Sequence, residues 1–263
     1  MASAQHLNGE ASQPGSTRRA DRARLASVPK LRAIDKSTDA FHLTYFDPPP
    51  GLERYILTLF EMRYFPQSVE AQHPGALGQL SLTVQGTARV RFGERTEWID
   101  NDAVLFNAFE VAAPYRAEGP LWVLGASFSP YGWAALTQAS LKEWGNRVIK
   151  ARDKLGEDVD RLNERVSQGR LSGELSAEQA CLEIADWIRP RLNDIPEAHE
   201  AIIDETLRWL GTSLNPPVEA LFEDAPYSRR QVERLVQRFF GFAPRGLARK
   251  YRAHRAANHL VQS

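Results

Sequence analysis

Arg230, Glu233 and Arg234, near the end of the chain, carry side chains that can read the edges of DNA bases. An arginine can donate two hydrogen bonds to guanine, and a glutamate can accept one from the amino group of cytosine. Spacings of three and four residues place the three side chains on one face of a helix. Such a reading face needs basic neighbours, because about half or more of the hydrogen bonds to DNA go to its backbone.

The charges of the chain are sorted by sign, although Lys plus Arg and Asp plus Glu both total 33. Residues 226–263 hold nine Arg or Lys and one acid, whereas residues 38–225 hold 17 Arg or Lys and 29 acids. Most charge runs are solvated faces. The concentration of Arg and Lys at the C-terminal end indicates instead a surface that binds phosphates. The candidates for phosphate contact are Ser228, Arg229, Arg238, Arg245, Arg249 and Lys250.

The residues around these charges predict a short helix, a turn and a longer helix. Asn215 can cap and Pro216 can open the short helix. Ser228 and Gln231 form a capping box for the longer one, and Gly241 is placed to end it. This order is typical of a helix-turn-helix, whose second helix enters the major groove. The apolar face of that helix is Val232, Leu235, Val236 and Phe239.

Roughly residues 218–260 resemble the first helix-turn-helix of the AraC/XylS family of bacterial transcription regulators. The family pattern runs Ser-x-Arg-x-Leu-x-Arg-x-Phe, then Gly-x-x-Pro, then Arg-x-x-Arg-Ala. The resemblance implies a sequence-specific regulator that binds double-stranded DNA in the bacterial cytoplasm. The matching residues are Ser228, Arg230, Val232, Arg234, Gly241, Pro244, Arg252, Arg255 and Ala256.

The AraC/XylS family has two helix-turn-helix units joined by a long helix. In this sequence the joining helix would be 244–260, and the 263 residues hold no second unit. Two interpretations therefore stay open. The chain is a regulator with one reading unit, or it is a truncated family member that no longer binds DNA and acts only through protein–protein contacts.

Residues 30–129 have the composition of strands. The segments 42–46, 53–62, 80–84, 88–92, 103–106 and 121–128 are rich in branched and aromatic residues. Turn signals separate them, among them Gln85-Gly86 and Gly119-Pro120. Six strands without intervening helices predict a barrel or sandwich. The family resemblance implies a cupin-like barrel that serves as a sensor or dimerisation domain.

The predicted fold class is α+β, with four segments. Residues 1–29 are expected to be a disordered basic arm, because they lack aromatic residues. A β-barrel or sandwich over 30–129 precedes a helical linker region over 130–195. In that region, spacing predicts one helix through Leu155 to Val166 and another from a Ser176 cap to Ile188. An all-α helix-turn-helix domain occupies 196–263, and it is truncated relative to the family.

The barrel region offers little chemistry for catalysis. His42 and His73 are its histidines and lie far apart, so no metal site is expected. No nucleophile elbow or glycine loop for phosphate appears, and we expect neither enzyme activity nor a cofactor. Aromatic residues are most often core, but six of them could line a pocket for a small-molecule effector. They are Tyr64, Trp98, Phe106, Phe109, Tyr115 and Trp122.

The remaining composition concerns the cell compartment and the assembly. Cys181 is the one cysteine, so no disulfide framework within the chain is expected, and a reducing cytoplasm is the default. No run of about 18 apolar residues and no secretory signal is present, so no membrane partner is expected. One helix-turn-helix reads few base pairs, and we therefore expect a homodimer that brings two reading helices together.

Overall fold

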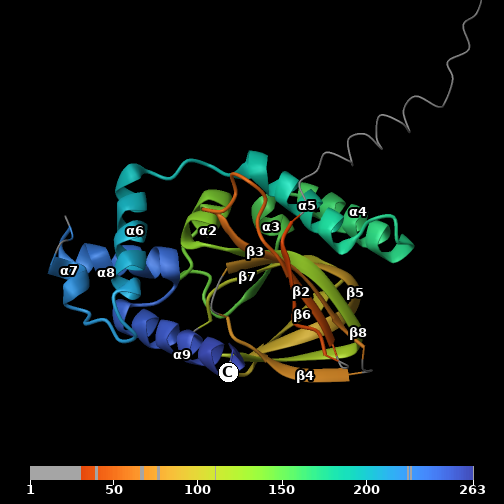
Figure 1. Cartoon of the computed structure of the whole chain (residues 1–263), viewed down its shortest axis with the longest axis horizontal. Helices are drawn as coiled ribbons and strands as arrows, with labels where there is room; N and C mark the ends of the chain where they lie inside the picture. Colours follow the sequence, from red (N-terminus) through yellow and green to blue (C-terminus); the bar gives the residue numbers. More distant parts are fainter. Residues whose placement is uncertain are drawn as a thin grey trace, which may run out of the picture. The chain divides into compact units, whose positions relative to one another are not determined.

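The computed structural model describes residues 31–262 except 39–40, 66–67, 76–77, 110, 224 and 226, with side chains to residue 253. The predicted arm at 1–29 lies outside the described residues. Leu31–Ser263 forms one compact unit. In Figure 1 a curled sheet occupies the right-hand side of this unit, and helices α6, α7 and α8 occupy the left. No described helix combines the length and apolar character that a membrane crossing requires.

Within the described residues, one antiparallel sheet contains all the strands, which run in the order β1-β2-β3-β8-β5-β7-β9. Strand β4 pairs with β8 and β6 with β5, to the side of this path. The antiparallel β architecture is confirmed, but the described pairing leaves free ends and does not close into a barrel. The strands are β1 (Ala33–Asp35), β2 (Phe41–Phe46), β3 (Ile56–Tyr64), β4 (Ser68–His73), β5 (Gly78–Phe92), β6 (Arg95–Asp100), β7 (Ala103–Phe106), β8 (Ala113–Phe128) and β9 (Val148–Lys150).

Two long strands carry the curl of the sheet. The first half of β5 pairs with the second half of β8, and this pair is flanked by β7 and β3. The second half of β5 pairs with the first half of β8, and this pair is flanked by β6 and β4. The predicted turns at Gln85-Gly86 and Gly119-Pro120 are wrong, because both strands continue through them. Gly86 has a φ of 92°, and a Cβ there would lie 2.2 Å from the Pro120 carbonyl oxygen. The glycine therefore makes a bulge that bends the strand instead of ending it.

Each face of the sheet has its own apolar cluster. One cluster lies inside the curl and includes Phe60, Val90 and Phe106. The other lies between the sheet and the helices, and it continues from Leu82 and Leu124 to Val236 in the C-terminal helices. The compact unit is therefore held together by one core that crosses the predicted segment boundaries, which themselves stay predictions.

The helical linker follows the sheet as its sequence predicts, with one break. Gly156 has a φ of 81° and separates α3 (Arg152–Leu155) from α4 (Asp158–Ser172), so Leu155 lies outside the longer helix. The capping box of Ser176 and Gln179 is confirmed at the start of α5 (Ala177–Ile188). Helix α2 (Pro130–Thr137) comes first, and a short 3₁₀ turn, η1 (Arg189–Arg191), comes last.

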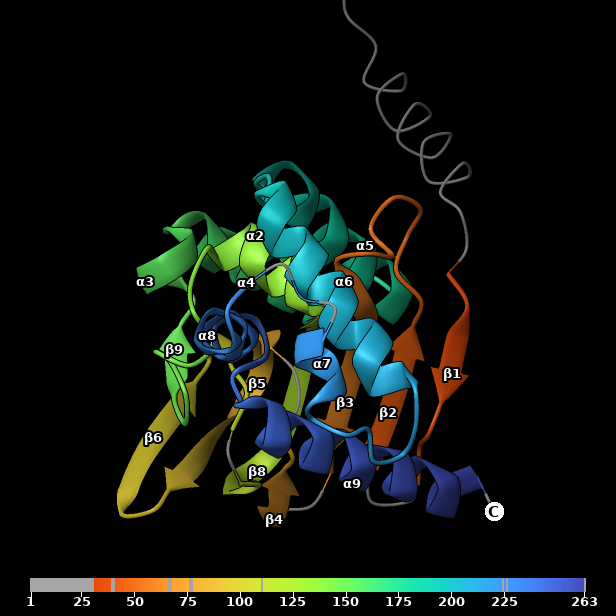
Figure 2. The same ribbon diagram turned by 90° about the vertical axis from the view of Figure 1, so that its left-hand side faces the viewer.

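The C-terminal helices are α6 (Glu197–Gly211), α7 (Ala220–Glu223), α8 (Arg229–Phe240) and α9 (Pro244–Gln262). The prediction that Pro216 opens the short helix is wrong, because α7 begins at Ala220. Pro216 precedes another proline, which disfavours helical backbone there. Asn215 is also engaged elsewhere, since its Oδ1 accepts a hydrogen bond from Arg252 at 2.8 Å. Figure 2 shows α9 crossing in front of the sheet.

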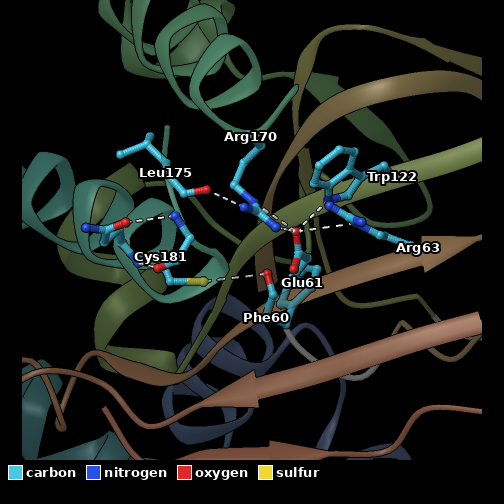
Figure 3. A network of polar contacts seen from close by, with 9 residues as sticks. Phe60, Glu61, Arg63, Trp122, Arg170, Leu175 and Cys181 are labelled. Carbon is cyan, nitrogen blue, oxygen red and sulfur yellow. Dashed lines mark hydrogen bonds and ion pairs between the residues drawn. The ribbon is translucent and has the colours of Figure 1, made fainter. Parts of the chain in front are cut away.

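A polar network attaches the linker helices to the outer face of the sheet (Figure 3). Glu61 Oε1 on β3 accepts hydrogen bonds from Trp122 Nε1 at 2.7 Å and from Arg170 Nη2, on α4, at 2.8 Å. The Arg63 guanidinium lies 3.3 Å from the centre of the Trp122 ring. The side chains of Glu61 and Arg170 are only 11% and 12% exposed. The Glu61 carboxylate thus neutralises the charge of Arg170 in a largely buried contact between α4 and β3.

Replacing Glu61 tests this contact. Glu61→Ala leaves Arg170 buried without its carboxylate, and we expect it to lower the free energy of unfolding by about 3 kcal/mol. Glu118→Ala is the matched control, because its contact with Arg89 is longer, at 3.9 Å, and about half-exposed. It should cost less than about 1 kcal/mol. Urea unfolding of both variants measures the difference, and equal losses would contradict the assigned role of Glu61.

Candidate functional site

The N-terminus of α8 is held by the capping box that its sequence predicts. Ser228 Oγ accepts a hydrogen bond from the Gln231 backbone N–H at 3.4 Å, and Gln231 Oε1 accepts one from the Ser228 backbone N–H at 3.0 Å. At the other end Gly241 takes the left-handed conformation, with a φ of 81°. These two caps fix where α8 begins and ends.

One face of α8 is buried and decides which residues lie on the other. Val232, Leu235, Val236, Phe239 and Phe240 are buried, and the helix packs against α2, α6 and α9. The α8 backbone is also tied to the segment after α2, because the Leu141 N–H donates to the Arg238 carbonyl at 2.8 Å. The helix therefore cannot rotate without exposing its apolar face.

The predicted base-reading residues lie on the opposite, solvent-facing side. Arg230 and Arg234 are exposed, and within the described residues neither makes an ion pair. Glu233 is partly buried, and its carboxylate lies 3.5 Å from Nε of Arg229. The Arg229 guanidinium also lies 4.5 Å from the ring centre of Phe222 on α7. In the free protein Arg229 and Glu233 form an ion pair with each other. The exposed side chains of Arg230 and Arg234 are accessible to a ligand.

The predicted phosphate-contacting residues fall into two groups. Arg238 on α8 and Arg245 and Arg249 on α9 are exposed. Ser228 is already engaged in the capping box. Lys250 is partly buried, and its Nζ donates a hydrogen bond to the Phe109 carbonyl in the loop after β7. Their roles toward DNA stay predictions, but Lys250 is occupied by an intramolecular contact that the sequence does not indicate.

A second candidate site is a cavity of about 310 Å³ inside the curl of the sheet. Its volume is about twice that of an engineered apolar cavity that binds benzene. Three of the six predicted aromatic residues, Tyr64, Phe106 and Tyr115, line it. Phe109 packs behind His73 instead, with ring centres 5.2 Å apart. Trp122 belongs to the network on the outer face of the sheet, and Trp98 is 58% exposed.

A chain of hydrogen bonds involves His73 and Gln79 of the cavity wall. His73 Nδ1 accepts a hydrogen bond from the Gly75 N–H at 3.1 Å, so its Nε2 can donate to Gln79 Oε1, at 3.2 Å. Gln79 in turn donates to Ser127 Oγ at 3.0 Å. Burial lowers the pKa of His73 to about 4, and the charge of Lys250 contributes in the same direction. His73 is therefore neutral at pH 7, and its ring stacks on Phe106 at 4.7 Å.

The hydroxyls of Tyr115 and Tyr64 form a second polar point in the cavity wall, at 2.6 Å. Burial raises the pKa of Tyr115, so its phenol stays neutral at pH 7. His42, the other histidine of the sheet, is exposed and packs edge-on against Phe65 at 4.8 Å. Within the part of the chain that the structure describes, no group of three or more His, Cys, Asp or Glu side chains is placed to hold a metal ion.

Comparison with known proteins finds similarity in solved structures alone. No family model and no curated protein matches the chain. The crystal structure of the AraC-like transcriptional activator CuxR matches over 90% of both chains, with 16% identity and a TM-score of 0.37. Vicilin from hazelnut, Corylus avellana, matches over 38% of this chain and 33% of its own, with 10% identity and a TM-score of 0.31. An oxalate decarboxylase variant from Bacillus subtilis matches over 46% and 38%, with 12% identity and a TM-score of 0.31.

The capping residue of α8 can be tested for stability. Ser228→Ala removes the acceptor for the Gln231 N–H and should cost about 1 kcal/mol in thermal or urea unfolding. Ser176→Ala, at the same capping box on α5, should cost a similar amount. Ser228→Asp should restore stability, because aspartate caps as well as serine does. If Ser228→Ala unfolds like the unmodified protein, the cap contributes nothing here.

Proposed function

We propose that this chain is a sequence-specific DNA-binding transcription regulator, and that α8 is its reading helix. The observation that carries the proposal is the division of α8 into a buried apolar face and an exposed face with Arg230 and Arg234. A helix that is anchored on one side and presents arginines on the other fits the major groove. The resemblance of residues 218–260 to an AraC-type helix-turn-helix supports the same role.

We propose different roles toward DNA for the exposed residues of this surface. Arg230 and Arg234 would read guanines, and Glu233 would either accept from a cytosine or hold Arg229 in place. Arg238, Arg245 and Arg249 would contact phosphates and orient the helix. Glu233 and Arg229 are joined at 3.5 Å in the free protein, so DNA must compete with that ion pair. The acidic stretch 38–225 would be repelled by DNA, which favours binding at the C-terminal end.

The sheet lobe would act as the sensor or the dimerisation domain of the regulator. We propose no enzyme activity and no cofactor for it, because its cavity is lined mainly by apolar side chains and a neutral histidine. A small-molecule effector and a second copy of the chain are the partners that we propose besides double-stranded DNA.

Replacing a base-reading arginine and replacing a phosphate-contacting arginine should have different effects on sequence preference and on the salt dependence of DNA binding. On a duplex selected from a random pool, Arg234→Ala should weaken binding by about 1–3 kcal/mol and relax the preference at one base pair. Arg245→Ala should weaken all sequences alike and lower the slope of log affinity against log salt by about one. Fluorescence anisotropy across a salt series measures both.

The outcomes separate the proposal from its alternative. Unchanged sequence preference in Arg234→Ala would show that the reading face is assigned wrongly. If the unmodified chain binds selected and scrambled duplexes with equal affinity, sequence-specific binding itself is refuted. Action through protein–protein contacts alone would then be the better interpretation.

Dimerisation should decide how specific the regulator is. A single helix-turn-helix buries roughly 600–1,000 Å² on DNA, so a monomer should discriminate weakly. A dimer should gain affinity for two half-sites that lie about one helical turn apart, or a multiple of it. Sedimentation establishes the state, and titration of duplexes with varied half-site spacing measures the gain. Discrimination above about 10³-fold by a verified monomer would refute this expectation.

A further inference from the structure

A further side chain, that of Gln237, lies on the same face of α8 as the two exposed arginines. It follows Arg230 by seven positions and Arg234 by three, so the three side chains lie within about 60° of one another around the helix axis. In homeodomains, residues at spacings of three, four and seven on one helix contact bases. Gln237 is nevertheless only partly exposed, unlike the two arginines. Another part of the chain therefore covers the exposed face of α8 at this point.

The segment between α2 and β9 provides this cover. Lys142 Nζ donates a hydrogen bond to Gln237 Oε1 at 2.7 Å. The segment is held there by its backbone, since the Leu141 N–H donates to the Arg238 carbonyl at 2.8 Å. A Cβ on Gly241, at the end of α8, would lie 3.5 Å from the Leu141 Cβ. The exposed side chain of Lys142 thus lies beside the exposed face of α8, although it belongs to a segment that precedes α8 by more than 80 positions.

The chemistry of the two groups fixes how the Gln237 amide is turned. An ammonium group donates three hydrogen bonds and accepts none. The amide atom that Lys142 contacts must therefore be the oxygen and not the nitrogen. The amide nitrogen of Gln237 keeps its two donors, and the Lys142 ammonium keeps two of its three. A second donor that approached the amide oxygen would meet the positive charge of Lys142, so together the two side chains offer DNA donors only.

A donor-only pair suits a different base from a lone glutamine. A lone glutamine matches adenine, because its oxygen accepts from N6 and its nitrogen donates to N7. Guanine instead presents two acceptors in the major groove, N7 and O6. With Lys142 on the amide oxygen, guanine can accept from both side chains. Adenine would turn its N6 amino group, which is a donor, toward an ammonium that cannot accept.

We propose that Lys142 and Gln237 form one guanine-reading pair, so that the segment between α2 and β9 supplies part of the DNA-reading surface. This inference rests on the proposed function, because it requires α8 to enter the major groove. Lys142 acts in two ways in the pair. Its ammonium donates to the base, and it keeps the amide oxygen of Gln237 from accepting a hydrogen bond from adenine.

Base preferences of two variants test the pair. Duplexes are selected from a random pool with the full chain, and single-base variants of them are measured by fluorescence anisotropy. The base pair concerned is the one at which Gln237→Ala loses its preference. There the unmodified chain should bind guanine at least about tenfold more tightly than adenine. Lys142→Met should lose this preference and favour adenine, because the amide oxygen becomes free to accept, whereas the preferences at other base pairs should stay.

Two further variants separate the pair from a general effect of charge. Lys142→Arg should keep the guanine preference, because a guanidinium also donates and does not accept. Lys150→Met is the matched control, since Lys150 lies on β9 and pairs with Asp102 at 3.0 Å. It should leave every base preference unchanged. A shift from guanine to adenine in Lys150→Met as well would overturn the specific role of Lys142.

The remaining outcomes distinguish failure of the pair from failure of the proposed function. If Arg234→Ala relaxes one base pair but Lys142→Met changes none, the pair is overturned and the proposed function stands. Guanine preference that is lost in Gln237→Ala and kept in Lys142→Met would show that Gln237 reads alone, which also overturns the pair. If the unmodified chain binds selected and scrambled duplexes equally, the proposed function fails and the pair fails with it.

Discussion

Burial of one face of α8 is the constraint on which the arrangement of the C-terminal residues depends. Val232, Val236 and Phe239 belong to the same apolar cluster as Leu82 and Leu124 of the sheet. Rotation of α8 by a third of a turn would expose two or three large side chains, at about 1.5–3 kcal/mol each. The positions of Arg230 and Arg234 at the surface are therefore a consequence of core packing, and the candidate DNA-binding face is as rigid as that core.

The curl of the sheet creates the cavity that is the second candidate site. Because β5 and β8 bend at Gly86 and near Gly119, each strand belongs to two layers, and the layers enclose a cavity between them. In the cavity wall His73 pairs with Gln79 and Tyr115 pairs with Tyr64, and His73 and Tyr115 stay neutral there. The outer face instead holds charge, and there Glu61 and Arg170 join helix to sheet.

Specific hydrogen bonds join the C-terminal helices to the segment after α2 and to the loop after β7. Lys142 Nζ donates to Gln237 Oε1 at 2.7 Å, and Leu141 and Lys250 donate to backbone carbonyls. Hydrogen bonds of this kind contribute about 1 kcal/mol each, so they can be exchanged for other partners at modest cost. The proposed regulator would need such exchangeable contacts, because a state that is held too firmly cannot respond to a ligand.

Local residue patterns determined the elements whose signals lie within a few positions of one another. Both capping boxes follow from side chains that bond to nearby backbone, and the stop at Gly241 follows from the freedom of glycine to turn left-handed, so no distant residue was needed to predict them. The apolar spacing in α8 likewise determined which arginines would be exposed. The identity of the exposed face of α8 is in this sense a property of the sequence by itself.

Tertiary structure alone decided what depends on residues far apart in the chain. Gln85-Gly86 has the composition of a turn, yet β5 continues through it, because β8 supplies partners on both sides of the bend. The sorting of the aromatic residues, with Tyr64 in the cavity and Trp98 outside, was set by strand register and by the curl. Lys250 reads as one more basic residue of α9, but folding brings it to the Phe109 carbonyl, 141 positions away. Sequence patterns describe the helix on which a side chain lies, whereas only the packed chain determines what that side chain meets.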